Sequence, residues 1–259
     1  MIVSPTVVEG FAVEVDVSEL PAGTVAVTVE RTVDADVRPV RGGRELPVAG
    51  DGALVWDWEV PLGYDIGYRV IALAANGSQL GASGFGQVTT PGIERPYVVL
   101  SDPLEGGSAR LVHALSGTDA QRSWSLPVSQ VHPSTMPDPI LHVAGRASVQ
   151  PWPLRLLTED QEAADSLREF LLSAAFVLVR TPAGIGLPPL LYGMPASITE
   201  RPLLDGSATW DMPLTVSGGP LVHILTSVWT YGDLESLGLL YGDLPAMFPT
   251  YRDLQRGPA

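Results

Sequence analysis

Residues that could carry out chemistry are few in this chain and do not form a recognisable constellation. The four histidines are His113, His132, His142 and His223, and no two are separated by the three or four residues of a helical metal pair. The chain has no cysteine, which excludes disulfides, thiolate nucleophiles and cysteine-ligated metal sites. We therefore expect no catalytic residues, no metal site and no cofactor, with the histidines on the surface or hydrogen-bonded in a core.

Serine and phosphate chemistry are equally poorly supported. The segment from Gly81 to Gly86 places Ser83 among glycines but misses the spacing of a nucleophile elbow by one position. A phosphate-binding loop needs a Gly-Lys pair, and the sequence contains no lysine. The glycine-rich segment is better interpreted as a turn with an edge strand.

Acidic side chains provide a further possibility. Asp57 and Glu59 share one face of a predicted strand, and paired carboxylates hydrolyse glycosides. Asp34, Asp36 and Asp51 have the ligand type for calcium but not the ordered spacing of a calcium loop. We expect these carboxylates to lie on a solvated strand face or in loops.

Trp56 and Trp58 lie two residues apart on one face of the same predicted strand. Such a pair can form an aromatic platform for a sugar, and it can equally anchor core or interface packing. The two interpretations lead to different functions, and we expect packing.

The elements that must position these residues are short and numerous. The chain has 259 residues with 24 Pro and 27 Gly, a length that suggests two domains and a composition that favours strands joined by turns. Its net charge is −14 and its arginines are scattered singly, so we expect no nucleic-acid binding. The N-terminus lacks signal-peptide features and no run of about 18 apolar residues occurs, so we expect a soluble protein made in the cytoplasm.

Residues 1–92 predict an immunoglobulin- or fibronectin-III-like β-sandwich. Apolar and polar residues alternate with the period of a strand, and Tyr68 is placed where such domains carry a tyrosine at the opening of their penultimate strand. Asn76-Gly77 predicts a hairpin turn, and Thr89–Gly92 predicts the domain boundary. The expected strands are 11–17, 25–29, 54–60, 68–74 and 84–88.

Residues 93–222 predict a β-barrel or sandwich with one packed helix near 159–173. Thr158 and Gln161 have the spacing of a capping box. The apolar stripe expected to face the sheet consists of Ala163, Ala164, Leu167, Phe170, Leu171 and Ala174. The expected strands are 97–100, 141–149, 154–156, 176–179, 190–192, 197–200 and 207–216.

Residues 223–259 form a tail with an internal repeat. A Tyr-x-Asp-Leu unit recurs three times at a spacing of ten residues, and the first and third copies begin with a threonine that can cap a short helix. Helices of about six residues are unstable alone, so they must dock on this protein or on a neighbour. The predicted contact residues are Tyr231, Leu234, Tyr241, Leu244, Tyr251 and Leu254.

The order of motifs over residues 140–256 resembles a known family. Gly145-Arg146 leads through Leu156-Leu157-Thr158 to the helix, Val177–Pro182, Ile198–Arg201, Trp210–Leu214 and the repeats. This order is similar to that of minor or distal tail proteins of long-tailed, siphovirus-type phages of actinobacteria.

The resemblance implies a structural protein of the virion, synthesised in the host cytoplasm and assembled as an oligomeric ring near the tail tip. Its implied partners are the tail tube and the tip or baseplate, with no membrane, no nucleic acid and no catalysis. An alternative is a carbohydrate-binding adhesion module for host attachment that uses Trp56 and Trp58. A third possibility is a hydrolase whose active site does not follow a known motif.

Overall fold

The computed structural model describes residues 1–8, 11–48, 50–115, 124–125, 128–131, 140–143, 148–149, 151–183 and 188–220. The described chain is mainly β, as the sequence predicts, with antiparallel sheets at the N-terminus followed by a closed six-stranded antiparallel barrel with one helix. The three tail repeats lie outside the described residues.

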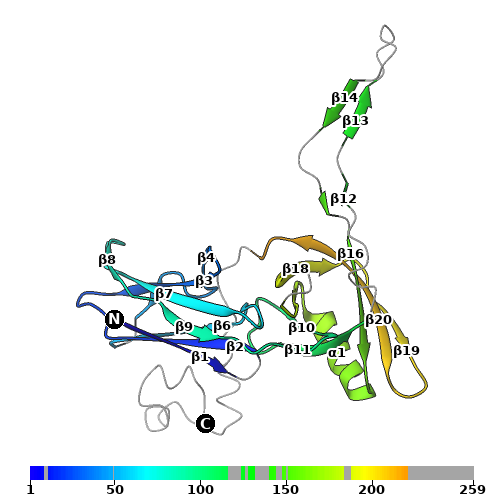
Figure 1. Cartoon of the computed structure of the whole chain (residues 1–259), viewed down its shortest axis with the longest axis horizontal. Helices are drawn as coiled ribbons and strands as arrows, with labels where there is room; N and C mark the ends of the chain where they lie inside the picture. Colours follow the sequence, from blue (N-terminus) through cyan, green and yellow to red (C-terminus); the bar gives the residue numbers. More distant parts are fainter. Residues whose placement is uncertain are drawn as a thin grey trace. The chain divides into compact units, whose positions relative to one another are not determined.

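Two antiparallel sheets make up the N-terminal part (Figure 1). The smaller sheet has the order β1-β2-β6, with bounds β1 Ile2–Val8, β2 Ala12–Ser18 and β6 Ala53–Asp57. The larger has the order β4-β3-β7-β8, with β5 on β3 and β9 on β7. Its bounds are β3 Ala26–Val33, β4 Asp36–Pro39, β5 Leu46–Pro47, β7 Asp65–Leu73, β8 Gln79–Ala82 and β9 Gly86–Thr89.

The two sheets share one core because the period-two pattern of the sequence places valines on the inward side of each strand. Val13, Val15, Val27 and Val29 are all fully buried. The predicted hairpin turn is confirmed: Gly77 has a φ of +78°, which glycine adopts without strain, and its N–H donates to the Ala74 carbonyl at 2.8 Å.

The second sheet system closes on itself (Figure 1). Its strand order is β16-β11-β10-β17-β18-β20, and β20 pairs back with β16, while β19 adds to β20. Of the two architectures predicted, barrel or sandwich, the structure has the barrel. The bounds are β10 Tyr97–Ser101, β11 Arg110–Ala114, β16 Trp152–Thr158, β17 Val177–Arg180, β18 Leu190–Pro195, β19 Thr199–Pro202 and β20 Ala208–Ser217.

The barrel core consists mainly of aliphatic side chains together with the indoles of Trp152 and Trp210. Leu154, Leu156, Met212 and Leu214 are fully buried, and Trp210 is 1% exposed. A buried indole N–H needs an acceptor. Trp210 Nε1 donates to the hydroxyl of Thr158 at 3.2 Å, and that hydroxyl donates to the Ala208 carbonyl at 3.3 Å, so this polar group is satisfied inside the core.

Helix α1 spans Gln161–Ser173 and buries Ala164, Leu167, Phe170 and Leu171, as predicted. Two details of the prediction are wrong. The N-cap is Asp160, whose carboxylate accepts from Ala163 N at 2.7 Å, because Thr158 still belongs to β16 and its hydroxyl serves Trp210. Ala163 is exposed, since it lies at the helix start beyond the edge of the buried stripe.

The described residues between β11 and β16 form four short strands. They are β12 Trp124–Ser125, β13 Val128–Val131, β14 Ile140–Val143 and β15 Ser148–Val149. Of the predicted strand over 141–149, the structure describes β14 and β15, and residues 144–147 lie outside the described residues. We call β12–β15 together the arm.

The described residues group into two compact units. One contains residues 1–111, 178–190 and Pro220, and the other contains 112–177 and 191–219. The domain boundaries at 92 and 222 remain predictions. No helix in the described part of the chain is long and apolar enough to cross a membrane.

Candidate functional site

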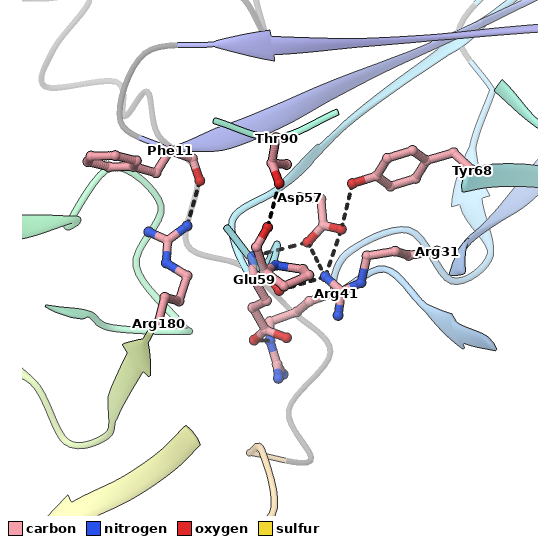
Figure 2. A network of polar contacts seen from close by, with 9 residues as sticks. Phe11, Arg31, Arg41, Asp57, Glu59, Tyr68, Thr90 and Arg180 are labelled. Carbon is pink, nitrogen blue, oxygen red and sulfur yellow. Dashed lines mark hydrogen bonds and ion pairs between the residues drawn. The ribbon is translucent and has the colours of Figure 1, made fainter. Parts of the chain in front are cut away.

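Asp57 is at the centre of a buried ionic network on the inward side of β6, which Figure 2 shows. Arg31 Nη1 donates to both carboxylate oxygens of Asp57, at 2.9 and 2.8 Å. The Tyr68 hydroxyl donates to the same carboxylate at 3.0 Å, and Glu59 N donates to it at 3.1 Å. Asp57 is 1% exposed and Arg31 is 7% exposed. A carboxylate so enclosed is held in one geometry by its donors.

The network continues through Glu59 to the beginning of the C-terminal segment. Arg31 Nη1 also donates to the Glu59 carbonyl at 2.7 Å. Arg41 Nε donates to Glu59 Oε1 at 2.5 Å, and Arg41 Nη1 donates to the Pro220 carbonyl at 2.9 Å. Two guanidinium groups thus face two carboxylates, and all four are buried or nearly so. Arg31 pairs with Asp57, and Arg41 pairs with Glu59.

The expectation that Asp57 and Glu59 lie on a solvated face is wrong. Period-two alternation puts Asp57 on the same side as Val55, which packs in the core. Arg31 continues the inward row of Val27 and Val29 in β3, and this is the signal that could have located the network in the sequence. An arginine in a row of core valines requires an inward carboxylate.

Tyr68 is held in its neutral form by this environment. Burial raises the pKa of its phenol strongly, and the charge of Asp57 raises it further. Asp57 and Glu59 are each engaged by arginine, so neither has the freedom of an acid–base pair. The arrangement is suited to fixing the sandwich and not to proton transfer.

Thr90, in the predicted linker, anchors the end of the sandwich (Figure 2). Its hydroxyl donates to the Pro61 carbonyl at 2.8 Å and accepts from Tyr64 N at 3.1 Å. With 3% of its surface exposed, Thr90 is part of the folded unit.

Arg180 of β17 holds the turn that precedes β2. Its Nη1 donates to the Phe11 carbonyl at 2.5 Å, and its guanidinium lies 5.9 Å from the centre of the Phe11 ring. Phe11 has a φ of +63°, which is uncommon for a residue other than glycine. Both contacts stabilise this backbone conformation.

Trp56 and Trp58 lie on the outward side of the same strand region that carries Asp57 inward. Their ring centres are 5.8 Å apart and their planes differ by 9°, an offset-stacked arrangement in which each ring covers part of the other. Both are half-buried. The cross-strand neighbour of Trp56 on β2 is Glu14.

The arm continues the pairing of β11 with β16. The barrel strands pair at Ala114 with Leu156, and the ladder resumes at Trp124 with Val149. Further pairs in the same antiparallel sense are Val128–Val143 through Val131–Ile140. Within the described pairs, the residue number rises along one strand as it falls along its partner, as antiparallel pairing requires.

The remaining sequence candidates that the structure describes are not brought together. Asp36 pairs with Arg38 at 2.6 Å, and Asp51 is exposed in a turn. His113 lies in β11, whereas His132 and His223 fall outside the described residues. Among the residues that the structure describes, no three His, Asp or Glu side chains are grouped to hold a metal ion.

Charged pairs of the barrel lie on its surface. Arg155 and Arg201 both contact Asp211, at 2.9 and 3.0 Å, and Arg168 bridges Glu200 and Asp165. Hydrogen bonds from Arg168 and Gln161 lower the pKa of Asp165. These groups are substantially solvated, in contrast to the sandwich network.

The predicted contact residues of the tail, from Tyr231 to Leu254, lie outside the described residues, so their docking stays a prediction. No family model, no curated protein and no solved structure matches the chain.

Proposed function

We propose that this protein is a structural component of a bacteriophage tail, a minor or distal tail protein that assembles as a ring near the tail tip and performs no catalysis. The arm is the observation that carries this proposal. The motif order over residues 140–256 supports it from the sequence. The buried ion pairs of Asp57 with Arg31 and of Glu59 with Arg41 are consistent with a structural role for these carboxylates.

The arm provides edges for assembly. Within the described residues, β12 with β15 and β13 with β14 are two-stranded sheets, so each strand has an outer edge without a strand partner. A two-stranded hairpin is marginally stable in water by itself. Exposed edges pair readily with other chains unless charges, prolines or bulges protect them.

The arm strands carry no such protection. None of their residues is Asp, Glu, Lys or Arg, although the chain has a net charge of −14. Copies of an acidic chain repel one another, and uncharged strands are where they can meet with least repulsion. Because the arm has a strand edge on each side, one copy can pair its edge with the opposite edge of the arm in the next copy. Such a head-to-tail interface closes into a ring when the rotation between neighbouring copies permits.

The N-terminal part fits an immunoglobulin- or fibronectin-III-like domain. The order β1-β2-β6 corresponds to strands A, B and E of that fold, and β3 and β7 with β8 or β9 correspond to C, F and G. Tyr68 lies in the strand corresponding to F, although its hydroxyl binds a carboxylate here. Domains of this kind serve as modules in many assemblies.

The chain offers a matched pair of variants to test the role of the arm. A Ser-Gln dipeptide occurs as Ser129-Gln130 in β13 and as Ser78-Gln79 at the beginning of β8. We expect S129E/Q130E to block tail assembly, because neighbouring copies would bring carboxylates together at about the 4.8 Å strand spacing. We expect S78E/Q79E to assemble normally.

Electron microscopy of phage particles produced with each variant gives the readout. Intact tails with S129E/Q130E would remove the arm as the assembly element. Defective tails with both variants would show a general effect of added charge and would equally contradict the proposal.

The alternative function, a carbohydrate-binding adhesion module, depends on Trp56 and Trp58. Because the rings stack on each other, each gives part of a face to its neighbour, and the platform left for a sugar is smaller than two separate indoles would provide. A glycan array with the full chain and its W56A and W58A variants tests it. Binding that both variants abolish would favour adhesion over the purely structural role.

A further inference from the structure

Two hairpin turns of this chain have the same hydrogen bonds. In the turn between β7 and β8, the Ala74 N–H donates to the Ser78 carbonyl at 2.8 Å, and the Gly77 N–H donates to the Ala74 carbonyl at 2.8 Å. The Ser78 N–H donates to the side-chain oxygen of Asn76 at 3.0 Å. Three hydrogen bonds therefore surround an Asn-Gly dipeptide, with Gly77 at a φ of +78°.

The turn between β19 and β20 repeats each of these contacts around an Asp-Gly dipeptide. The Leu203 N–H donates to the Ser207 carbonyl at 2.8 Å, and the Gly206 N–H donates to the Leu203 carbonyl at 3.2 Å. The Ser207 N–H donates to Asp205 Oδ1 at 3.0 Å, and Gly206 has a φ of +88°. One turn geometry therefore accommodates asparagine in the first hairpin and aspartate in the second.

An Asn-Gly dipeptide carries a reaction of its own. The glycine nitrogen attacks Cγ of the asparagine, an N–Cγ bond forms and the Cγ–Nδ2 bond breaks. Nδ2 leaves as ammonia with the proton of the glycine N–H, and a succinimide ring remains. Water then opens the ring at the former side-chain carbonyl, which gives aspartate, or at the main-chain carbonyl, which gives isoaspartate. Glycine favours ring closure because it has no Cβ to shield its nitrogen.

Asn76 meets the requirements of this reaction. It is the single asparagine of the sequence, and it is exposed in its turn. The space around Gly77 is open, since a Cβ at that position would meet no atom within 4 Å. The turn opposes the reaction, because the Gly77 N–H is engaged by Ala74 and the amide oxygen of Asn76 is engaged by Ser78. Ring closure therefore requires these hydrogen bonds to open.

Asp205 has the same turn but a less reactive side chain. Hydrogen bonds from the Ser207 hydroxyl, at 2.6 Å, and from the Ser207 N–H lower the pKa of Asp205. Its carboxyl group is therefore ionised near neutral pH, and a carboxylate is a poor electrophile for ring closure. The two turns thus separate the effect of the side chain from the effect of the backbone geometry.

We propose that Asn76 is a site of spontaneous deamidation, that the intact β7–β8 turn slows the reaction, and that the turn accepts the aspartate product. Asp205 supports this acceptance, because it makes the same backbone contact that the product at position 76 would make. Isoaspartate adds a methylene to the main chain and cannot reproduce these contacts. The conversion to aspartate adds one negative charge to an exposed hairpin of a chain whose net charge is −14. This proposal is independent of the phage-tail proposal, because it concerns the chemistry of one turn.

Reciprocal substitutions in the full chain use each turn as the control for the other. The parent chain, N76D and N76D/D205N are incubated folded in mildly alkaline buffer. Intact mass spectrometry follows the gain in mass that accompanies replacement of the side-chain NH2 by OH, and peptide mapping locates it. We expect a gain at position 76 in the parent chain, no gain at positions 76 and 205 in N76D, and a gain at position 205 in the double variant.

Two further measurements test the effect of the turn. The parent chain should deamidate several-fold faster when unfolded in guanidinium chloride than when folded in the same buffer, because unfolding opens the hydrogen bonds of Gly77 and Asn76. The N76D variant should unfold at the same denaturant concentration as the parent chain.

Four outcomes would overturn the proposal. A folded parent chain that gains no mass at position 76 would show that Asn76 is not a site in the native protein. Equal rates in folded and unfolded chains would show that the turn does not slow the reaction. A lower unfolding midpoint for N76D would show that the turn does not accept aspartate. A double variant without a gain at position 205 would show that the shared turn geometry does not determine reactivity.

Discussion

The N-terminal sandwich and the barrel use charge in opposite ways. In the sandwich, Arg31 and Asp57 are enclosed between the two sheets, and the neighbouring side chains of Arg41 and Glu59 are only 9% and 10% exposed. In the barrel, Arg155 is 58% and Arg201 is 66% exposed by side chain, and both reach Asp211 from outside an apolar core.

The buried ion pairs of the sandwich fix one arrangement of the chain, whereas the exposed pairs of the barrel mainly keep its surface solvated. Burying two charges costs desolvation that their attraction only partly offsets, so a buried pair fixes one arrangement more than it adds stability. An exposed pair in water is screened and contributes little. The sandwich should therefore depend strongly on each partner, whereas the barrel should tolerate losing its partners.

The largest effect is expected from Arg31→Met. Removing the cation leaves Asp57 buried without its main partner, which typically costs about 3–5 kcal/mol. The counterpart Arg155→Met in the barrel should cost about 0–1 kcal/mol. Hydrogen exchange of the β7 and β16 amides under native conditions measures the stability of the two regions separately. Equal losses of stability from the two variants would contradict the contrast between sandwich and barrel.

Tyr68→Phe should have the next largest effect. It removes a hydrogen bond to a charged carboxylate, worth about 1.5–3 kcal/mol. Burial raises the pKa of this phenol in the folded protein, so its contribution is complete below the ordinary tyrosine pKa of about 10 and is lost as pH rises beyond it.

Unfolding by urea as a function of pH tests this sign. The parent chain should lose stability above about pH 10, and the phenylalanine variant should lose less over the same range. If the stability of the parent chain and of the variant fell identically with rising pH, Tyr68 would not be the group that controls stability in alkaline solution.

Asp160→Ala should destabilise the barrel moderately. Loss of an N-cap side chain typically costs about 0.5–2 kcal/mol, and Asp160 caps α1 through Ala163 N. Glu159→Ala, one residue earlier, is the matched control and should have a small effect. Thermal unfolding followed by circular dichroism compares them, and a larger loss from Glu159→Ala would contradict the observed cap.

Arg168→Met should have the smallest effect. Arg168 bridges Glu200 and Asp165 at the surface, where solvent and salt screen the pairs. The small loss should disappear at high ionic strength, which stability measurements in increasing sodium chloride can check. A loss as large as that of Arg31→Met would place this pair among the buried ones.

Strand positions were predictable from the sequence, because alternation of residues such as Val13 and Val15 reports directly which side is buried. The helix was predictable for the same reason, with Leu167 and Phe170 at helical spacing. Its cap was not, because Thr158 and Asp160 both satisfy the local pattern. Only the barrel pairing, which commits Thr158 to Ala208, decides between them.

The ionic network was missed for a different physical reason. Its members Arg31, Asp57 and Tyr68 are far apart in sequence, and their contact exists only because two sheets pack face to face. The arm was also missed, since the pairing of Trp124 with Val149 requires the two barrel strands that precede and follow it. The stacked Trp56 and Trp58 were recognised, and their geometry favours packing.

The most direct test of the central claim is quantitative mass spectrometry of purified phage particles from a genome that encodes this chain. The account predicts that the protein is present in several copies in every particle and is retained when tails are separated from heads. Its absence from purified tails would contradict the assignment to the virion.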